Sequence, residues 1–255
     1  MAKPGRALLL AELTAGARAA SRFRSPEAVL LSRGWSRLAA GWTLRFGATA
    51  LVDQFAVREA VFFALGCDIL RGKPTSLVVD IGSGFSALGL RWARTFPDCS
   101  VLELDLPAVA QSKRRRVESL GKPDNWHAAG FNLSTGCLED ALSGKRACLL
   151  SLQGVLPYFS AEDIGRLADN WRDRSLAAQG VLLCDLLDAG YFDNQGKSLS
   201  RSPFRSRFAD AAAAARVFTQ AGFEPVESTA LEILGRPLGW RNPGNNGLFI
   251  CKAFA

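Results

Sequence analysis

Residues 77–107 constrain the fold more than any other segment of this chain. A short apolar run leads to Asp80 and then to a tight turn that contains Gly82 and Gly84. An amphipathic stretch follows, and a second apolar run ends at Asp105. The order strand, glycine turn, helix, strand and acid is typical of the nucleoside-binding half of an α/β sheet.

The glycine turn does not say which nucleoside is bound. A dinucleotide fingerprint would place a third glycine at position 87, where this chain has Ala87, a residue that the pattern allows. An acid about twenty residues after the turn can accept hydrogen bonds from two ribose hydroxyls. Asp105 and Glu103 both meet that requirement, and an ordinary βα turn without a ligand is the remaining alternative.

The rest of the chain alternates between predicted strands and helices, which favours a parallel sheet covered by helices on both faces. Two strands follow the last long helix, so we expect a doubly wound α/β sheet of seven strands. The predicted strands are 76–81, 100–104, 126–131, 147–152, 180–186, 223–230 and 247–253. The predicted helices are 7–20, 26–46, 54–70, 86–96, 107–119, 137–143, 160–177 and 207–221, with a long loop at 188–206.

Two parts of one domain are expected. Residues 1–70 predict a helical cap that packs on the core, and residues 71–255 predict the sheet. Ser25, Pro26 and Glu27 form a typical start for the second helix, with proline at the first helical position.

Composition excludes several classes of protein. No stretch approaches the roughly 18–20 apolar residues of a membrane span, and the apolar run near the N-terminus is too short for a signal peptide. One histidine and six scattered cysteines argue against a metal site and for buried free thiols. We therefore expect a cytoplasmic protein that binds neither membrane nor nucleic acid.

The net charge of +7 is uneven. Residues 1–47 hold eight Lys and Arg against two Glu, which gives +6 and leaves about +1 for the rest. Either a solvated basic face or attraction for an anionic substrate or partner explains this distribution.

Three motifs resemble one family. Asp105-Leu106-Pro107 follows the second strand and leads into the basic run 113–116, and QGVLPYF spans residues 153–159. These features resemble the leucine carboxyl methyltransferase family over about residues 15–190. The family includes polyketide O-methyltransferases and protein phosphatase methyltransferases. The resemblance implies a class I methyltransferase fold that binds S-adenosylmethionine (SAM), and natural product biosynthesis is one expected setting.

The resemblance also implies roles for individual residues. Arg58 would pair with the SAM carboxylate, Asp105 would hold the ribose, and Asn132 would meet the adenine amino group. Asn132 and Gln153 stand where the family has acids, and Ser86-Ala87-Leu88 also departs from its pattern. The expected cofactor-binding residues are Arg58, Asp80, Gly82, Gly84, Asp105, Leu106, Asn132, Leu133 and Gln153.

The methyl acceptor is less constrained. A carboxylate is already ionised at pH 7, whereas a phenol benefits from a general base. The only histidine, His127, lies at the far end of its predicted strand, so no catalytic residue is assigned. The expected reaction is O-methylation of a carboxylate or hydroxyl on a small molecule or peptide terminus, an acidic acceptor included. Tyr158 and Arg205 are the candidate acceptor-binding residues.

Two other functions stay open. A degenerate methyltransferase fold could act as a binding or scaffold protein, because two family acids are amides here. An NAD(P)-dependent oxidoreductase would tolerate Ala87, but Tyr158 is followed four residues later by Glu162 rather than by the lysine of a short-chain proton relay.

Overall fold

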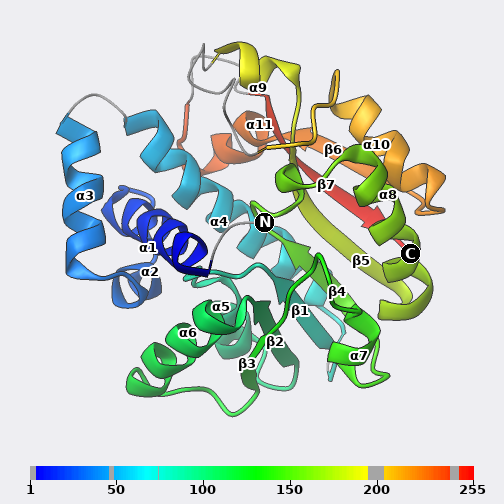
Figure 1. Ribbon diagram of the computed structural model, residues 1–255, viewed down its shortest axis with the longest axis horizontal. Coiled ribbons are helices and arrows are strands. Elements are labelled where there is room, and N and C mark those ends of the chain that lie inside the picture. Colours follow the sequence, from blue (N-terminus) through cyan, green and yellow to red (C-terminus); the bar gives the residue numbers. More distant parts are fainter. Residues whose placement is uncertain (1–3, 46–48, 74, 195–203, 242–246) are drawn as a thin grey trace. The chain divides into compact units, whose positions relative to one another are not determined.

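Four helices precede the first strand of the computed structural model, which describes residues 4–45, 49–73, 75–194, 204–241 and 247–255. They are α1 (Pro4–Ala20), α2 (Pro26–Leu31), α3 (Gly34–Arg45) and α4 (Thr49–Leu70). The chain clusters into two units, Met1–Gly136 and Cys137–Ala255, which are described in turn. Figure 1 shows the four helices in blue and cyan.

The predicted helix at 26–46 is wrong in one respect, because it is two helices. Ser25 accepts a hydrogen bond from the Ala28 N–H and caps α2, as its sequence indicates. At Ser32 the backbone becomes extended (φ −87°, ψ 149°), which ends α2. The bend lets α3 pack closely on α1: a Cβ on Gly16 would lie only 2.2 Å from the Ser36 carbonyl oxygen.

The first unit contains three parallel strands in the order β3-β2-β1. They are β1 (Leu77–Ile81), β2 (Ser100–Asp105) and β3 (Trp126–Gly130), joined by α5 (Leu88–Thr95) and α6 (Pro107–Ser119). All three strands lie where the sequence predicts them. Because parallel strands share one carboxyl edge, Asp80 and Asp105 come to the same edge of this sheet.

A buried ion pair joins α6 to the sheet. The Lys113 Nζ lies 2.6 Å from the Glu103 Oε2, and both side chains are fully buried. Gly89 of α5 makes room for the pair, since a Cβ there would lie 2.3 Å from the Glu103 Oε1. Burial raises the pKa of Glu103, while Lys113 lowers it. Glu103, the alternative partner for ribose hydroxyls, is therefore engaged inside the unit.

The second unit contains the other four strands. They are β4 (Ala147–Leu152), β5 (Leu176–Leu187), β6 (Val226–Ala230) and β7 (Leu248–Phe254). Strand β5 pairs with β4 in parallel and with β7 in antiparallel orientation, and β7 pairs with β6 in antiparallel orientation. The helices are α7 (Leu138–Leu142), α8 (Ala161–Asn170), α9 (Ala189–Asn194), α10 (Ala211–Gln220) and α11 (Leu231–Gly235).

Several boundaries in this unit differ from the prediction; for example, α10 begins at Ala211 instead of 207 and β6 at Val226 instead of 223. Helix α8 ends at Asn170, a π-helical turn covers Trp171–Ser175, and β5 begins at Leu176 instead of 180. The wide turn places Trp171 in the core, where it is 2% exposed. The predicted loop at 188–206 contains α9, near whose start the Asp188 Oδ1 accepts a hydrogen bond from the Tyr191 N–H at 3.3 Å. Residues 195–203 of that loop lie outside the described residues.

The fold class is the predicted one. Three strands in the first unit and four in the second give the seven strands of a mixed α/β sheet, with helices between them and a helical extension before β1. The search for membrane spans, made over the described residues, finds no helix with the length and hydropathy to cross a bilayer.

The Glu103–Lys113 pair predicts a stability test. Lys113→Met leaves an uncompensated buried carboxylate and should lower the free energy of unfolding by about 3–5 kcal/mol. The double variant Glu103→Leu/Lys113→Met removes both charges and should recover most of that loss. Urea unfolding followed by circular dichroism measures both. Arg71→Ala, which breaks an exposed pair with Asp68, is the control and should change stability by less than about 1 kcal/mol.

Candidate functional site

One carboxylate joins the glycine turn to the end of β2. The Asp105 Oδ2 accepts a hydrogen bond from the Gly84 N–H at 2.7 Å, and its Oδ1 accepts one from the Leu106 N–H at 2.7 Å. Burial raises the pKa of Asp105, and these two backbone donors and Lys113 lower it. The side chain is thereby held at the carboxyl ends of β1 and β2.

The glycine turn needs its glycines. Gly82 and Gly84 have φ values of 68° and 50°, in the left-handed region that side chains disfavour. The Gly82 N–H donates to the Leu104 carbonyl oxygen at 2.7 Å, which fixes the turn beside β2. A Cβ on Gly84 would meet only the Ala11 Cβ, at 3.7 Å, so α1 lies beside the turn.

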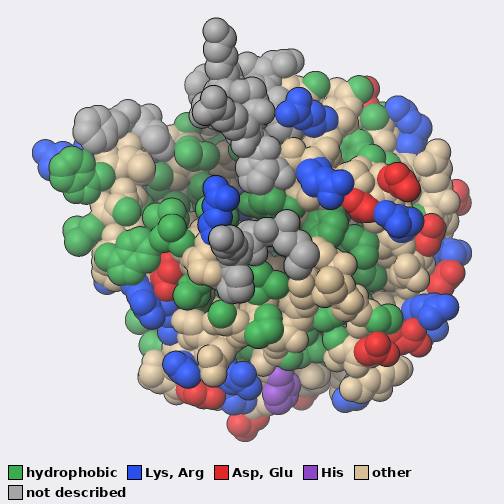
Figure 2. All heavy atoms as spheres, in the orientation of Figure 1, with side chains coloured by type: hydrophobic (Ala, Val, Ile, Leu, Met, Phe, Trp, Pro, Cys, Tyr) green, Lys and Arg blue, Asp and Glu red, His purple; other side chains and the backbone are tan. Residues whose placement is uncertain are grey.

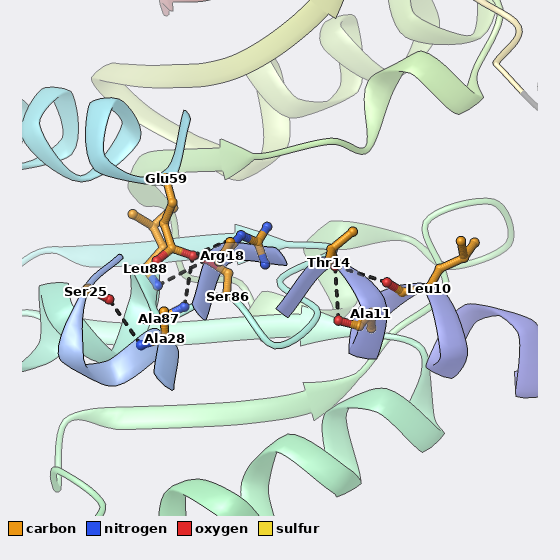
Figure 3. A network of polar contacts seen from close by, with 10 residues as sticks. All are labelled: Leu10, Ala11, Thr14, Arg18, Ser25, Ala28, Glu59, Ser86, Ala87 and Leu88. Atoms are coloured by element: carbon orange, nitrogen blue, oxygen red, sulfur yellow. Dashed lines mark hydrogen bonds and ion pairs between the residues drawn. The ribbon is translucent and has the colours of Figure 1, made fainter. Parts of the chain in front are cut away.

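A buried glutamate from α4 holds the far end of the turn. The Glu59 Oε2 accepts a hydrogen bond from the Ser86 hydroxyl at 2.6 Å and one from the Ala87 N–H at 3.2 Å. The Arg18 Nε of α1 lies 3.2 Å from the same oxygen. Figure 3 shows these side chains converging on the start of α5 from two N-terminal helices. The sequence motifs did not predict a role for either Glu59 or Arg18.

Two further contacts attach α1 and Ser21, the residue that follows it, to other helices of the first unit. Glu12 forms an ion pair with Arg116 of α6, and the Arg116 guanidinium stacks on the Phe85 ring at 3.7 Å from the centroid. The Ser21 hydroxyl donates to the Asp53 Oδ1 at 2.7 Å. Acids within apolar helical stretches were the sequence signal for Glu12 and Glu59, because a buried acid requires a partner.

The remaining predicted residues of the first unit lie on three elements. Arg58 is half-buried on α4, with its guanidinium 5.4 Å from the Phe55 centroid. Asp80 is buried at the end of β1. Asn132 and Leu133 follow β3 and are half-buried. The Asn132 Oδ1 accepts a hydrogen bond from the Ser134 N–H at 3.1 Å, so the oxygen predicted to meet an adenine amine already has one donor.

The other three predicted residues belong to the second unit. Gln153 follows β4 and is buried, and the neighbouring Gly154 N–H donates to the Asp185 Oδ1 at 2.6 Å. The Tyr158 ring meets Phe204 edge to face with centroids 5.1 Å apart. The Arg205 N–H donates to the Pro157 carbonyl oxygen at 2.7 Å. Tyr158 and Arg205, the two residues expected to bind the acceptor, therefore lie on chain segments that are in contact.

The N-terminal helices carry exposed apolar side chains beside their arginines. On α3, Trp35, Leu38 and Trp42 recur at helical spacing and are 43%, 70% and 65% exposed. Arg37 and Arg45 of the same helix are exposed as well. Figure 2 shows hydrophobic side chains gathered over the region where Figure 1 places α3 and α1. The surface is therefore mixed apolar and basic.

The described residues give little support for a metal site or for His127 as a catalytic base. Among the described residues, no cluster of three His, Cys, Asp or Glu could hold a metal ion. His127 is exposed at the beginning of β3, whereas Asp105 lies at the carboxyl end of the parallel strand β2.

Comparison with known proteins identifies the family. The family model for leucine carboxyl methyltransferase matches residues 18–172, more than half of the chain. A search of curated proteins finds no match.

Solved structures show the fold. A candidate O-methyltransferase from Nostoc punctiforme is 16% identical, with a TM-score of 0.56 over 76% of this chain and 55% of its own. Human N-acetylserotonin methyltransferase in complex with SAM is 17% identical, with a TM-score of 0.54 over 80% of this chain and 53% of its own. The magnesium protoporphyrin IX methyltransferase of Synechocystis, with bound S-adenosylhomocysteine (SAH), is 15% identical. Its TM-score is 0.54, over 77% of this chain and 82% of its own.

This chain spans only a little over half the length of the first structures that it matches. Those structures share its fold, and the family model covers the glycine turn, Asp105 and the segment at 153–159. The chain belongs to the leucine carboxyl methyltransferase family.

Proposed function

We propose that this protein is a SAM-dependent O-methyltransferase. The observation that carries the proposal is the Asp105 carboxylate, held by backbone N–H groups between the glycine turn and the end of β2. Family membership supplies the reaction class. Three of the structural neighbours were solved with SAM or SAH bound.

The residues at this edge of the sheet fit such a cofactor. Each carboxylate oxygen of Asp105 has two lone pairs and uses one for a backbone N–H, so each can still accept a ribose hydroxyl. A Cβ placed on Gly84 would have only one neighbouring heavy atom within 4 Å. A close backbone approach to the ligand is therefore sterically feasible.

The proposed roles follow the family pattern. Arg58 would bind the amino-acid carboxylate, because a guanidinium can bind both oxygens at once. Asp80 would lie beneath the turn and attract the ammonium group. The Asn132 Oδ1 would accept a hydrogen bond from the adenine amine with its second lone pair. The proposed cofactor-binding set is Arg58, Asp80, Gly82, Gly84, Asp105, Leu106, Asn132, Leu133 and Gln153, and Tyr158 and Arg205 are proposed for the acceptor.

The cofactor supplies an electrophilic methyl group on a sulfonium, and the protein's contribution is alignment. In-line displacement requires the acceptor oxygen at roughly 3 Å from the methyl carbon. A carboxylate acceptor needs no base at pH 7. Because His127 lies at the opposite end of its strand, we propose a carboxylate of a small molecule or peptide terminus as the first acceptor class to test, and hydroxyl compounds as the second.

We propose the cytoplasm as the setting. All six cysteines are free thiols, as is usual in a reducing compartment. Natural product biosynthesis is the proposed pathway type, because the family includes polyketide O-methyltransferases.

Cofactor binding provides the first test. Wild-type protein should bind SAM and SAH in isothermal titration calorimetry. Asp105→Ala removes two charge-assisted hydrogen bonds to the ribose and should weaken SAH binding by at least about 100-fold. Asp98→Ala, at an exposed aspartate before β2, is the matched control and should bind as wild type does.

The same titration separates the alternatives. Wild-type protein that binds neither SAM nor SAH at high micromolar ligand would contradict the proposal and favour a binding or scaffold role. Binding of NADH instead would favour an oxidoreductase.

The raised pKa of Asp105 predicts the pH dependence of binding. The ribose contact uses the ionised carboxylate, so affinity falls as the pH drops through the pKa. Because burial raises that pKa above the ordinary value of 3.8, the loss should begin at a higher pH than for an exposed aspartate. Calorimetry of SAH from pH 8 down to pH 5 measures the profile. Asp105→Asn, which has no titrating carboxyl group, should show a flatter one, and identical profiles would contradict this assignment.

A further inference from the structure

The N-terminus of α5 already holds an anion that belongs to the chain itself. Ala87 precedes the helix and has no side chain that could cap it. The Glu59 carboxylate accepts from the Ala87 N–H, and it accepts from the Ser86 hydroxyl, which in turn accepts from the Leu88 N–H at 3.2 Å. Glu59 of α4 thus accepts from the N–H that precedes α5, and Ser86 of the turn accepts from the first N–H of the helix (Figure 3).

The charge of this carboxylate is balanced inside the unit. Glu59 is 2% exposed and Arg18 is 5% exposed, and they form an ion pair. Glu59 therefore brings a negative charge to the position where the helix dipole and free N–H groups are most favourable to an anion.

In dinucleotide-binding folds, that position receives the pyrophosphate of the ligand. A nucleotide phosphate placed here would meet the Glu59 carboxylate instead of free N–H groups. SAM has no phosphate, and its reactive sulfonium is a cation. The start of α5 thus favours a nucleoside without phosphate groups.

We propose that Glu59 is a positioning and specificity-determining residue of the cofactor site. It holds the glycine turn through Ser86 and Ala87, and because its carboxylate already occupies the Ala87 N–H that a phosphate would need, it disfavours nucleotides that carry phosphates. This inference rests on the proposed function, since it concerns the same turn. It also makes α1 part of the site's support, because Arg18 balances the charge.

The test uses Glu59→Ala and Glu59→Gln in the full-length protein, with Asp68→Ala, at an exposed acid of α4, as the control. Calorimetry measures the dissociation constants of SAH and ADP. Wild type and Asp68→Ala should bind SAH and should bind ADP at least about 100-fold more weakly. Glu59→Ala should bind SAH about 10- to 100-fold more weakly, because one charge-assisted contact to the turn is lost. Its ratio of SAH to ADP affinity should fall at least tenfold.

Formate distinguishes positioning from a general loss of structure. In Glu59→Ala, formate can occupy the vacated carboxylate position, and it should restore SAH affinity relative to chloride at equal ionic strength. Circular dichroism checks that each variant is folded. Glu59→Gln keeps the side-chain shape and serves if Glu59→Ala does not fold; it should lower the same ratio.

The inference is overturned if the folded variants keep the wild-type ratio of SAH to ADP affinity, or if formate has no effect on Glu59→Ala. Wild-type protein that binds ADP as tightly as SAH would also overturn it. If wild type binds neither ligand, the proposal that SAM is the cofactor is contradicted. Exclusion of phosphates by Glu59 is then tested by whether Glu59→Ala binds ADP.

Discussion

The Asp105 carboxylate is the contact on which the geometry of the candidate site depends. Its two oxygens hold the glycine turn after β1 and the backbone that enters α6 after β2. A turn with positive φ at Gly82 and Gly84 has no regular ladder to stabilise it, so it needs external acceptors for its N–H groups. The half-buried Asp105 therefore fixes the position of the end of β1 relative to the end of β2.

The N-terminal helices complete this arrangement from the other side. Glu59 and Arg18 fix the start of α5, and Arg116, paired with Glu12, covers Phe85 of the turn. Glu12 and Glu59 each have an oppositely charged partner from another helix, which is the usual condition for keeping ionised groups in a protein interior. Ion pairs and hydrogen bonds consequently connect α1 and α4 to the glycine turn and to α5.

Sequence reasoning predicted the strands well, because most of them, such as β1, β4 and β7, are short apolar runs. It placed Asp105 at the end of the second strand, but it did not predict that this carboxylate accepts a hydrogen bond from the Gly84 N–H. It missed the break at Ser32, which depends on close packing of α3 against Gly16, and the early start of β5, which follows a π-helical turn. It also missed Glu59 and Arg18, since their partnership joins positions 41 residues apart and no local pattern encodes such a contact. The assigned ligand roles of Arg58, Asn132 and Gln153 remain predictions.

The three attachments of α1 have a practical consequence for anyone who shortens this protein. Removing the first 21 residues would leave the carboxylate of Glu59 without its cation, and it would take the Ser21 hydroxyl away from Asp53. It would also free Arg116 from Glu12. Helix α1 thus supplies charged partners to buried groups of the first unit, and a trimmed chain would have to rebuild that balance by substitution.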